Sequence, residues 1–158
     1  MKLTTKPQKY YQLQELTEKP EVYTLSQLLI TMEPWRTLKY SAQNLSNYLQ
    51  KAELYKYSIL ADQKLVGVVC VRYPWLRGAC LELLAIAPSQ QGKGIGRDII
   101  QLLETELSKT NYNNLWTLVS SFNHKAQQFY EKMGFIKVGQ LDDLIIEGYS
   151  EFLLRKSR

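Results

Sequence analysis

A glycine-rich segment at residues 91–96, with the sequence QGKGIG, has the residue types and spacing of a phosphate-binding loop. It follows an apolar run that ends at Pro88, and residues 97–104 after it have a helical pattern. Glycines let the backbone approach a phosphate closely, and the free amides of a first helical turn point at the anion with the helix dipole behind them. The order of strand, glycine loop and helix therefore predicts a site for a phosphorylated cofactor.

Two common phosphate loops do not fit this segment. The dinucleotide fingerprint needs glycine where Arg97 stands, and no acidic residue at the end of a second parallel strand completes it. A Walker A loop needs four residues between its glycines and then Gly-Lys-Ser/Thr. The segment instead resembles the pyrophosphate loop of the GNAT family of N-acetyltransferases, Gln/Arg-x-x-Gly-x-Gly/Ala. The apolar strand that ends at Pro88 is also similar to the family's strand before this loop.

A second segment, residues 123–135 with the sequence NHKAQQFYEKMGF, resembles the family's other cofactor motif, Asn-x-x-Ala-x-x-Phe-Tyr-x-x-x-Gly-Phe, at every fixed position. Apolar residues at helical spacing give it one apolar face: Ala126, Phe129, Tyr130 and Met133. Asn123 is suited to cap such a helix, and Gly134 is suited to end it. An ordinary amphipathic helix would show the same stripe. Two motifs in the family's order favour the resemblance, which covers roughly residues 55–155.

The resemblance implies that the chain binds acetyl-CoA. In the family, the backbone of the strand before the loop pairs with the pantetheine arm like an added strand, and the loop amides hold the pyrophosphate. The Gln91 side chain is expected to join them, and Asn123 is expected near the pantetheine amide. The cofactor-binding residues implied in this way are Leu84, Ala85, Ile86, Gln91, Gly92, Lys93, Gly94, Ile95, Gly96, Arg97, Asn123, Ala126, Phe129 and Tyr130. No metal is expected, since one histidine and two cysteines offer no zinc-ligand spacing.

Tyr130 and Glu82 are the catalytic candidates that the resemblance implies. A phenol has a pKa near ~10, close to that of an alkyl thiol, so Tyr130 is suited to protonate the departing thiolate. Without the motif it would be read as a core residue, one of eleven tyrosines. Glu82 lies inside an apolar strand, and in many family members a glutamate there takes the amine proton. Its alternative is an outward-facing strand residue. A desolvated amine needs no strong base, and His124 is expected at the surface.

The acceptor site is less clearly marked. In the family, the first two helices, their connection and the final strand pair enclose this site. Residues 31–40 fall in the connection between the two helices. Trp35 is expected to form an aromatic wall of the acceptor site, and Glu33 to attract a cationic amine. The alternative for Trp35 is a core residue that packs between the helices. Three further acidic residues lie between the last two strands: Asp142, Asp143 and Glu147. They would either add negative potential near the acceptor or be loop residues without a role in the site. These candidates favour a small-molecule amine over a peptide α-amine or a protein lysine.

Composition is that of an ordinary globular protein. The chain has 158 residues, of which 45% are hydrophobic and 22% charged, and we expect one domain over residues 1–158. No apolar run reaches ~18 residues and the N-terminal segment has no apolar core, so we expect a cytoplasmic protein without a membrane partner. Cys70 and Cys80 lie in apolar strand settings and are expected to be buried free thiols.

The net charge of +5 would permit a nucleic-acid partner, but the lysines and arginines are scattered along the chain. Positive side chains near the two motifs, at Lys93, Arg97 and Lys125, fit the attraction of anionic coenzyme A instead. The expected partners are therefore acetyl-CoA and an amine acceptor, with no nucleic acid; a homodimer is left open.

Hydrophobic periodicity predicts a mixed α/β fold. The predicted strands are 10–15, 55–60, 65–72, 80–87, 115–119, 135–141 and 148–155, and the predicted helices are 21–30, 41–49, 94–109 and 123–133. Their order resembles that of the GNAT fold, a single domain with a mostly antiparallel sheet of about seven strands and about four flanking helices. The resemblance implies acetyl transfer to a primary amine by direct attack in a ternary complex. A non-catalytic acyl-CoA sensor of the same fold is the alternative.

Overall fold

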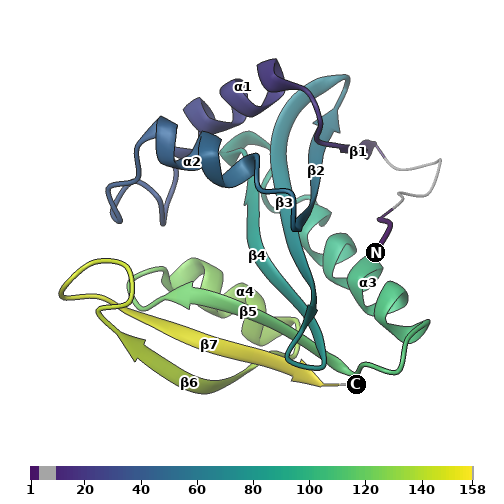
Figure 1. The fold of residues 1–158 in the computed structure, drawn as a ribbon, viewed down its shortest axis with the longest axis vertical. Helices are drawn as coiled ribbons and strands as arrows, with labels where there is room; N and C mark the ends of the chain where they lie inside the picture. Colours follow the sequence, from purple (N-terminus) through teal and green to yellow (C-terminus); the bar gives the residue numbers. More distant parts are fainter. Residues whose placement is uncertain (4–9, 158) are drawn as a thin grey trace.

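Seven strands form one sheet in the computed structural model, which describes residues 1–3 and 10–157. The strands lie in the order β1-β2-β3-β4-β5-β7-β6, and each neighbouring pair is antiparallel except β4 and β5 (Figure 1). The strands are β1 (Tyr11–Glu15), β2 (Leu54–Ala61), β3 (Lys64–Trp75), β4 (Gly78–Ile86), β5 (Asn114–Ser120), β6 (Ile136–Asp142) and β7 (Ser150–Ser157). The predicted mixed α/β fold with a mostly antiparallel sheet is confirmed.

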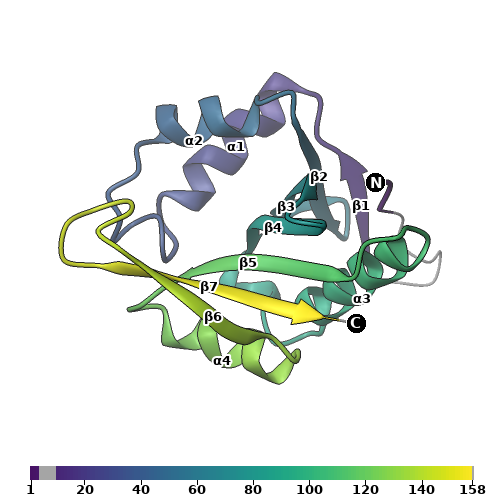
Figure 2. The same cartoon turned by 60° about the horizontal axis from the view of Figure 1, so that its bottom comes forward.

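The helices cover both faces of the sheet. They are α1 (Lys19–Leu29), α2 (Ala42–Leu49), α3 (Ile95–Ser108) and α4 (His124–Lys132), with a short 3-10 turn, η1 (Pro88–Gln90), before the glycine loop. Figure 2 shows α1 and α2 on one side of the sheet and α3 and α4 on the other. Each pair has its own buried cluster, which includes Leu25 and Leu45 on the first side and Ile99 and Leu103 on the second. The sheet is therefore buried on both faces near its centre.

Local sequence explains where the helices begin. The Ser41 hydroxyl accepts a hydrogen bond from the Asn44 backbone amide at 3.0 Å, and the Ser41 backbone amide donates one to the Asn44 side-chain oxygen, which makes a capping box at α2. Asn123 caps α4 as predicted, because its side chain accepts from the Ala126 amide at 3.3 Å. The first helix begins at Lys19, earlier than predicted, since Pro20 lies in the first turn, where a missing N–H does no harm.

The parallel pairing of β4 with β5 is short, and this defines the site. It runs from Gly78 opposite Asn114 to Leu81 opposite Thr117, and beyond these residues the two strands diverge (Figure 1). The Thr117 hydroxyl donates to the Leu81 carbonyl at 2.9 Å at the point of divergence. After Leu81, β4 continues to pair with β3 on its other side as far as Ile86. Backbone groups on the β5 side of β4 therefore face the space between the strands.

A register shift in the β3–β4 ladder lies at the same place. Cys70 pairs with Leu83 and Val71 with Leu81, which leaves Glu82 as the extra residue of a β-bulge. Both cysteines are buried free thiols, as predicted. None of the helices in the described ranges is long and apolar enough to cross a membrane.

Candidate active site

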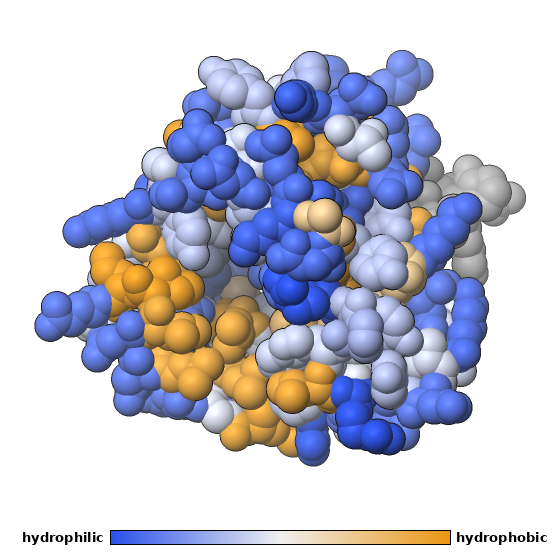
Figure 3. Space-filling model, in the orientation of Figure 1, coloured by the Kyte–Doolittle hydropathy of each residue, from blue (hydrophilic) through white to orange (hydrophobic). Residues whose placement is uncertain are grey.

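A cavity of about 950 Å³ lies where β4 and β5 diverge. Its walls come from the α1–α2 connection, α2, the end of β3, β4, η1, the glycine loop, the start of α3, β5, α4 and one residue each of the β6–β7 loop and β7. Figure 3 shows a hollow near the middle of this face, with apolar side chains gathered to its left and below it. Ile145 of the β6–β7 loop lines the cavity and its neighbour Leu144 is exposed. The cavity therefore brings together segments far apart in the sequence.

Nearly all of the predicted site residues line this cavity. They are Glu33, Trp35, Glu82, Leu84, Ala85, Ile86, Gln91, Gly92, Gly94, Ile95, Gly96, Arg97, Asn123, Ala126, Phe129 and Tyr130. Lys93 does not line it: its ammonium group donates to the Gln90 side chain at 3.0 Å, and its carbonyl accepts from the Tyr10 hydroxyl at 3.2 Å. His124 is exposed, as expected.

The glycine loop depends on its glycines in two different ways. Gly94 is the N-cap of α3 with a φ of 89°, a left-handed conformation that a side chain would strain. At Gly96, a Cβ atom would come within 3.0 Å of the Phe129 ring, so its absence lets α3 approach α4. The first helical bond runs from the Asp98 amide to the Gly94 carbonyl, which leaves the amides of residues 95–97 without intrahelical partners. These amides lie at the cavity wall, at a helix N-terminus, which is a place suited to an anion.

The Gln91 side chain forms hydrogen bonds to two elements, β4 and α4. Its amide nitrogen donates to the Ile86 carbonyl at 2.8 Å, and its oxygen accepts from the Lys125 ammonium group. The end of β4 is thereby tied to the first turn of α4. Lys125 and Arg97 are exposed and place positive charge beside the loop. A direct contact from Gln91 to a pyrophosphate stays a prediction.

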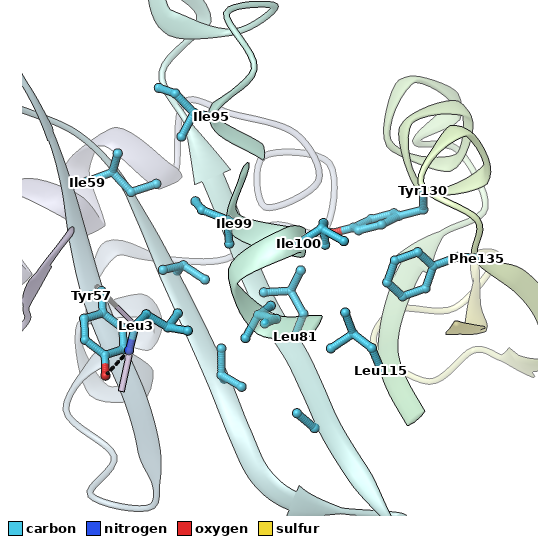
Figure 4. Packing of buried hydrophobic residues seen from close by; sticks show 14 of the residues in the cluster. Leu3, Tyr57, Ile59, Leu81, Ile95, Ile99, Ile100, Leu115, Tyr130 and Phe135 are labelled. Atoms are coloured by element: carbon cyan, nitrogen blue, oxygen red, sulfur yellow. Dashed lines mark hydrogen bonds between the residues drawn. The ribbon is translucent and has the colours of Figure 1, made fainter. Parts of the chain in front are cut away.

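Tyr130 is both a core residue and a cavity residue, so the two alternatives for it are not exclusive. Its side chain is 7% exposed and packs edge-on against Phe129 and Phe135, with ring centroids 5.1 and 5.3 Å away. In Figure 4 the ring extends from α4 toward Ile100 of α3. Burial raises the pKa of Tyr130 to about 12, with the Thr117 hydroxyl as a hydrogen-bonding partner that opposes the rise. The phenol is therefore protonated at neutral pH near the divergence of β4 and β5.

Glu82 faces the cavity rather than bulk solvent, but its carboxylate already has partners. Arg72 Nε donates to Glu82 Oε1, and the Tyr48 hydroxyl donates to Oε2 at 2.6 Å. Burial raises the pKa of Tyr48 and the hydrogen bond to Glu82 raises it further; the same carboxylate raises the pKa of Arg72. Sequence reasoning missed both partners, because they belong to α2 and β3 and meet Glu82 only in the folded structure.

The predicted acceptor residues have mixed surroundings. The Glu33 carboxylate accepts from Arg36 Nη2 at 2.6 Å and from the Thr37 amide at 3.3 Å, so its charge is already paired. Trp35 lines the cavity and also packs against the core under α1 and α2. Asp142 accepts hydrogen bonds from Gln140 and Ser150, Asp143 accepts one from the Gly148 amide, and neither these two residues nor Glu147 line the cavity.

Glu151 is a cavity residue that sequence reasoning missed. It lies on β7, is only 4% exposed, and accepts a hydrogen bond from the Ser120 hydroxyl at 2.7 Å. Burial raises the pKa of the Glu151 carboxyl. The pKa of Tyr40 is also raised, mainly by the burial of Tyr40 itself and secondly by the charge of Glu151. The sequence signal for it is weak: Glu151 lies beside the apolar residues Phe152, Leu153 and Leu154, in a strand whose other residues are polar or charged. In residues 1–3 and 10–157, no group of three His, Cys, Asp or Glu side chains could hold a metal ion.

Comparison with known proteins gives one consistent family. The sequence pattern of the Acetyltransferase (GNAT) family matches residues 12–135. Streptothricin acetyltransferase of Streptomyces lavendulae is 33% identical over 89 residues, which cover 56% of this chain and 47% of that protein. Spermidine N(1)-acetyltransferase of Vibrio cholerae is 30% identical over 91 residues, covering 56% and 53%. The chain thus matches about half the length of these two relatives.

The fold gives the same result. The crystal structure of the ribosomal-protein-S18-alanine N-acetyltransferase of Escherichia coli superposes with a TM-score of 0.71 at 19% identity and covers 93% of each chain. The family match spans most of the chain and includes both cofactor motifs up to Phe135. With its sheet, glycine loop and divergent strands, this chain belongs to the GNAT acetyltransferase family.

Proposed function

We propose that the protein transfers an acetyl group from acetyl-CoA to a primary amine by direct attack in a ternary complex. The observation that carries the proposal is the cavity at the divergence of β4 and β5, which the glycine loop and Tyr130 both line. Its size and its enclosure by the α1–α2 connection favour a small-molecule amine over a protein lysine.

The residues present fit acetyl-CoA. The pyrophosphate is proposed to accept hydrogen bonds from the amides of residues 92–97, with Arg97 and Lys125 adding positive charge. The pantetheine arm is proposed to pair with the backbone of β4 at residues 84–86, where no pairing with β5 competes. Ala126 and Phe129 line the same cavity and would pack against the arm.

The proposed chemistry forms a C–N bond to the acetyl carbon and breaks its C–S bond. Burial in the cavity disfavours the ammonium form of the amine, so the amine loses its proton on entry, and Glu82 is the proposed proton acceptor. The Tyr130 phenol, protonated at neutral pH, is proposed to donate its proton to the departing sulfur. Tyr48 and Arg72 fix the position of the Glu82 carboxylate.

Replacement of Tyr130 by phenylalanine tests the proposal. We expect amine-dependent thiol release to fall by about 10²–10⁴-fold, the usual contribution of a positioned acid, while acetyl-CoA affinity hardly changes. Tyr23→Phe, at an exposed position on α1, is the matched control and should behave like the wild type. Unchanged turnover in Tyr130→Phe would exclude the acid. If wild-type protein binds acetyl-CoA but acetylates no amine, the sensor alternative is favoured.

A further inference from the structure

We propose that Glu151 binds a second positive charge on the acceptor, so that the substrate is a small diamine rather than a monoamine. This rests on the proposed function, whose cofactor and acid it takes as given. Glu151 would be a specificity-determining residue: it holds the far end of the acceptor while the near end attacks the thioester.

The first argument is that the Glu151 carboxylate is buried without a cation. It lies in the wall of the cavity, 4% exposed, with the neutral Ser120 hydroxyl as its hydrogen-bond donor at 2.7 Å. No lysine or arginine in the described residues forms an ion pair with it, in contrast to Glu33 and Glu82. A buried carboxylate is unfavourable unless a positive group compensates it. The cavity in front of it is where such a group can be supplied by a ligand.

The second argument is the position of Glu151 relative to Tyr130. On β5 and β7, Thr117 pairs with Leu154 and Ser120 pairs with Glu151, and Thr117 is the hydrogen-bonding neighbour of Tyr130. Three residues along a strand span about 10 Å. Side chains alternate between the two faces of a strand, so Thr117 and Glu151 project to opposite faces of the β5–β7 ladder, and both line the cavity. Tyr130 and Glu151 are therefore close neighbours in one cavity, which suits an acceptor whose two nitrogens are joined by a short alkyl chain.

The third argument is that the surrounding wall suits an alkyl chain with a charged end. Tyr40, close enough to Glu151 for the carboxylate to contribute to its raised pKa, lines the cavity together with Trp35 and Leu38. Aromatic faces attract ammonium groups, and apolar side chains pack against methylenes. The carboxylate therefore provides the charged contact in a wall that otherwise accepts hydrocarbon.

A purely structural role for the Ser120–Glu151 pair makes a different prediction about stability. Burial raises the pKa of the Glu151 carboxyl above its unfolded value. Folding stability is then lost as the pH rises through the folded-state pKa, and the ionised carboxylate weakens the fold at neutral pH. Glu151→Gln keeps an oxygen that can accept from Ser120 and removes the charge. A ligand-binding role predicts an unchanged or raised melting temperature for this variant, whereas a structural role predicts a lowered one.

The test compares 1,5-diaminopentane with n-pentylamine, which has the same chain and one ammonium group. Thermal unfolding at matched ionic strength and without cofactor should show a larger stabilisation of the wild type by the diamine. With acetyl-CoA, kcat/KM for thiol release should favour the diamine by about 10-fold or more, mainly through KM, as a charged hydrogen bond implies. Both preferences should disappear in Glu151→Gln and persist in Glu15→Gln, an exposed control on β1 outside the cavity.

The outcomes separate this inference from the proposed function. If the wild type acetylates both amines equally well, or Glu151→Gln keeps the diamine preference, Glu151 does not bind a second positive charge of the acceptor. The proposed acetyltransferase function would not be affected by this result. Failure of acetyl-CoA to bind would overturn the proposed function, while the cofactor-free measurement would still decide whether Glu151 binds the diamine. The wild-type comparison needs no variant, so equal acetylation of the two amines would overturn the inference even if Glu151→Gln does not fold.

Discussion

Glu82 and Glu151, two of the carboxylates that line the cavity, differ in their hydrogen-bonding partners. Glu82 is paired with Arg72 and accepts from Tyr48, whereas Glu151 accepts from a neutral serine. The sequence indicated Glu82, a carboxylate inside an apolar strand where many family members have a glutamate, but it showed neither its partners nor the position of Glu151 in the cavity. These hydrogen bonds join strands and helices that are far apart in the chain, so local sequence patterns cannot predict them.

The hydrogen bond from Tyr48 to Glu82 should stabilise the fold measurably. It is 2.6 Å long, and its acceptor is a charged group with a half-buried side chain. We expect Tyr48→Phe to lower the free energy of unfolding by about 1–2 kcal/mol, as for other hydrogen bonds to charged groups. Urea unfolding measures this, with the exposed Tyr55→Phe as the control. Equal loss in both variants would mean that the bond contributes nothing specific.

The pKa of Tyr130 makes a prediction about pH. Burial raises it to about 12, so the acid stays protonated well above its ordinary range and is lost only as the pH rises through that value. We expect kcat/KM to rise with pH as the free amine loses its proton, and kcat to show no falling limb below about pH 10. A falling limb centred near pH 8 or 9 in kcat, absent from Tyr130→Phe, would contradict the raised pKa.

At the scale of elements, periodicity predicted the order of strands and helices, and the structure confirms it. The observed boundaries differ from the predicted ones by a few residues. For example, α1 begins at Lys19, with Pro20 in its first turn. The features that form the site could not be predicted in this way. The end of the β4–β5 ladder at Leu81 and the bulge at Glu82 depend on pairing between strands, and so does the placement of β7 between β5 and β6.

The start of α3 requires a left-handed backbone conformation at Gly94. We expect Gly94→Ala to lower the free energy of unfolding by about 1–2 kcal/mol, because alanine is unfavourable at a left-handed φ of 89°. Calorimetry should also show weaker acetyl-CoA binding, since relief of the strain would turn the first amides of α3. Ser89→Ala, at an exposed position in η1, is the control. Unchanged affinity in Gly94→Ala would argue against a role for this loop in binding the pyrophosphate.

At the scale of the whole molecule, the net charge of +5 favours an anionic ligand. Arg97 is largely exposed beside the glycine loop, so its contribution should be screened by salt. We expect acetyl-CoA affinity to fall as the ionic strength rises from low to physiological values. Arg97→Gln should weaken binding at low salt and flatten this dependence, whereas Arg77→Gln, an exposed change outside the cavity, should do neither. An affinity independent of salt would contradict electrostatic attraction.

Acetyl transfer is tested most directly by mass analysis of the amine after incubation with acetyl-CoA and the protein. The cavity, the glycine loop and the protonated Tyr130 predict an N-acetylated product, formed together with an equal amount of free coenzyme A and greatly reduced in Tyr130→Phe. Product formed equally well by the wild type and Tyr130→Phe would contradict the proposed acid. Absence of acetyl-CoA binding would contradict the proposed function itself.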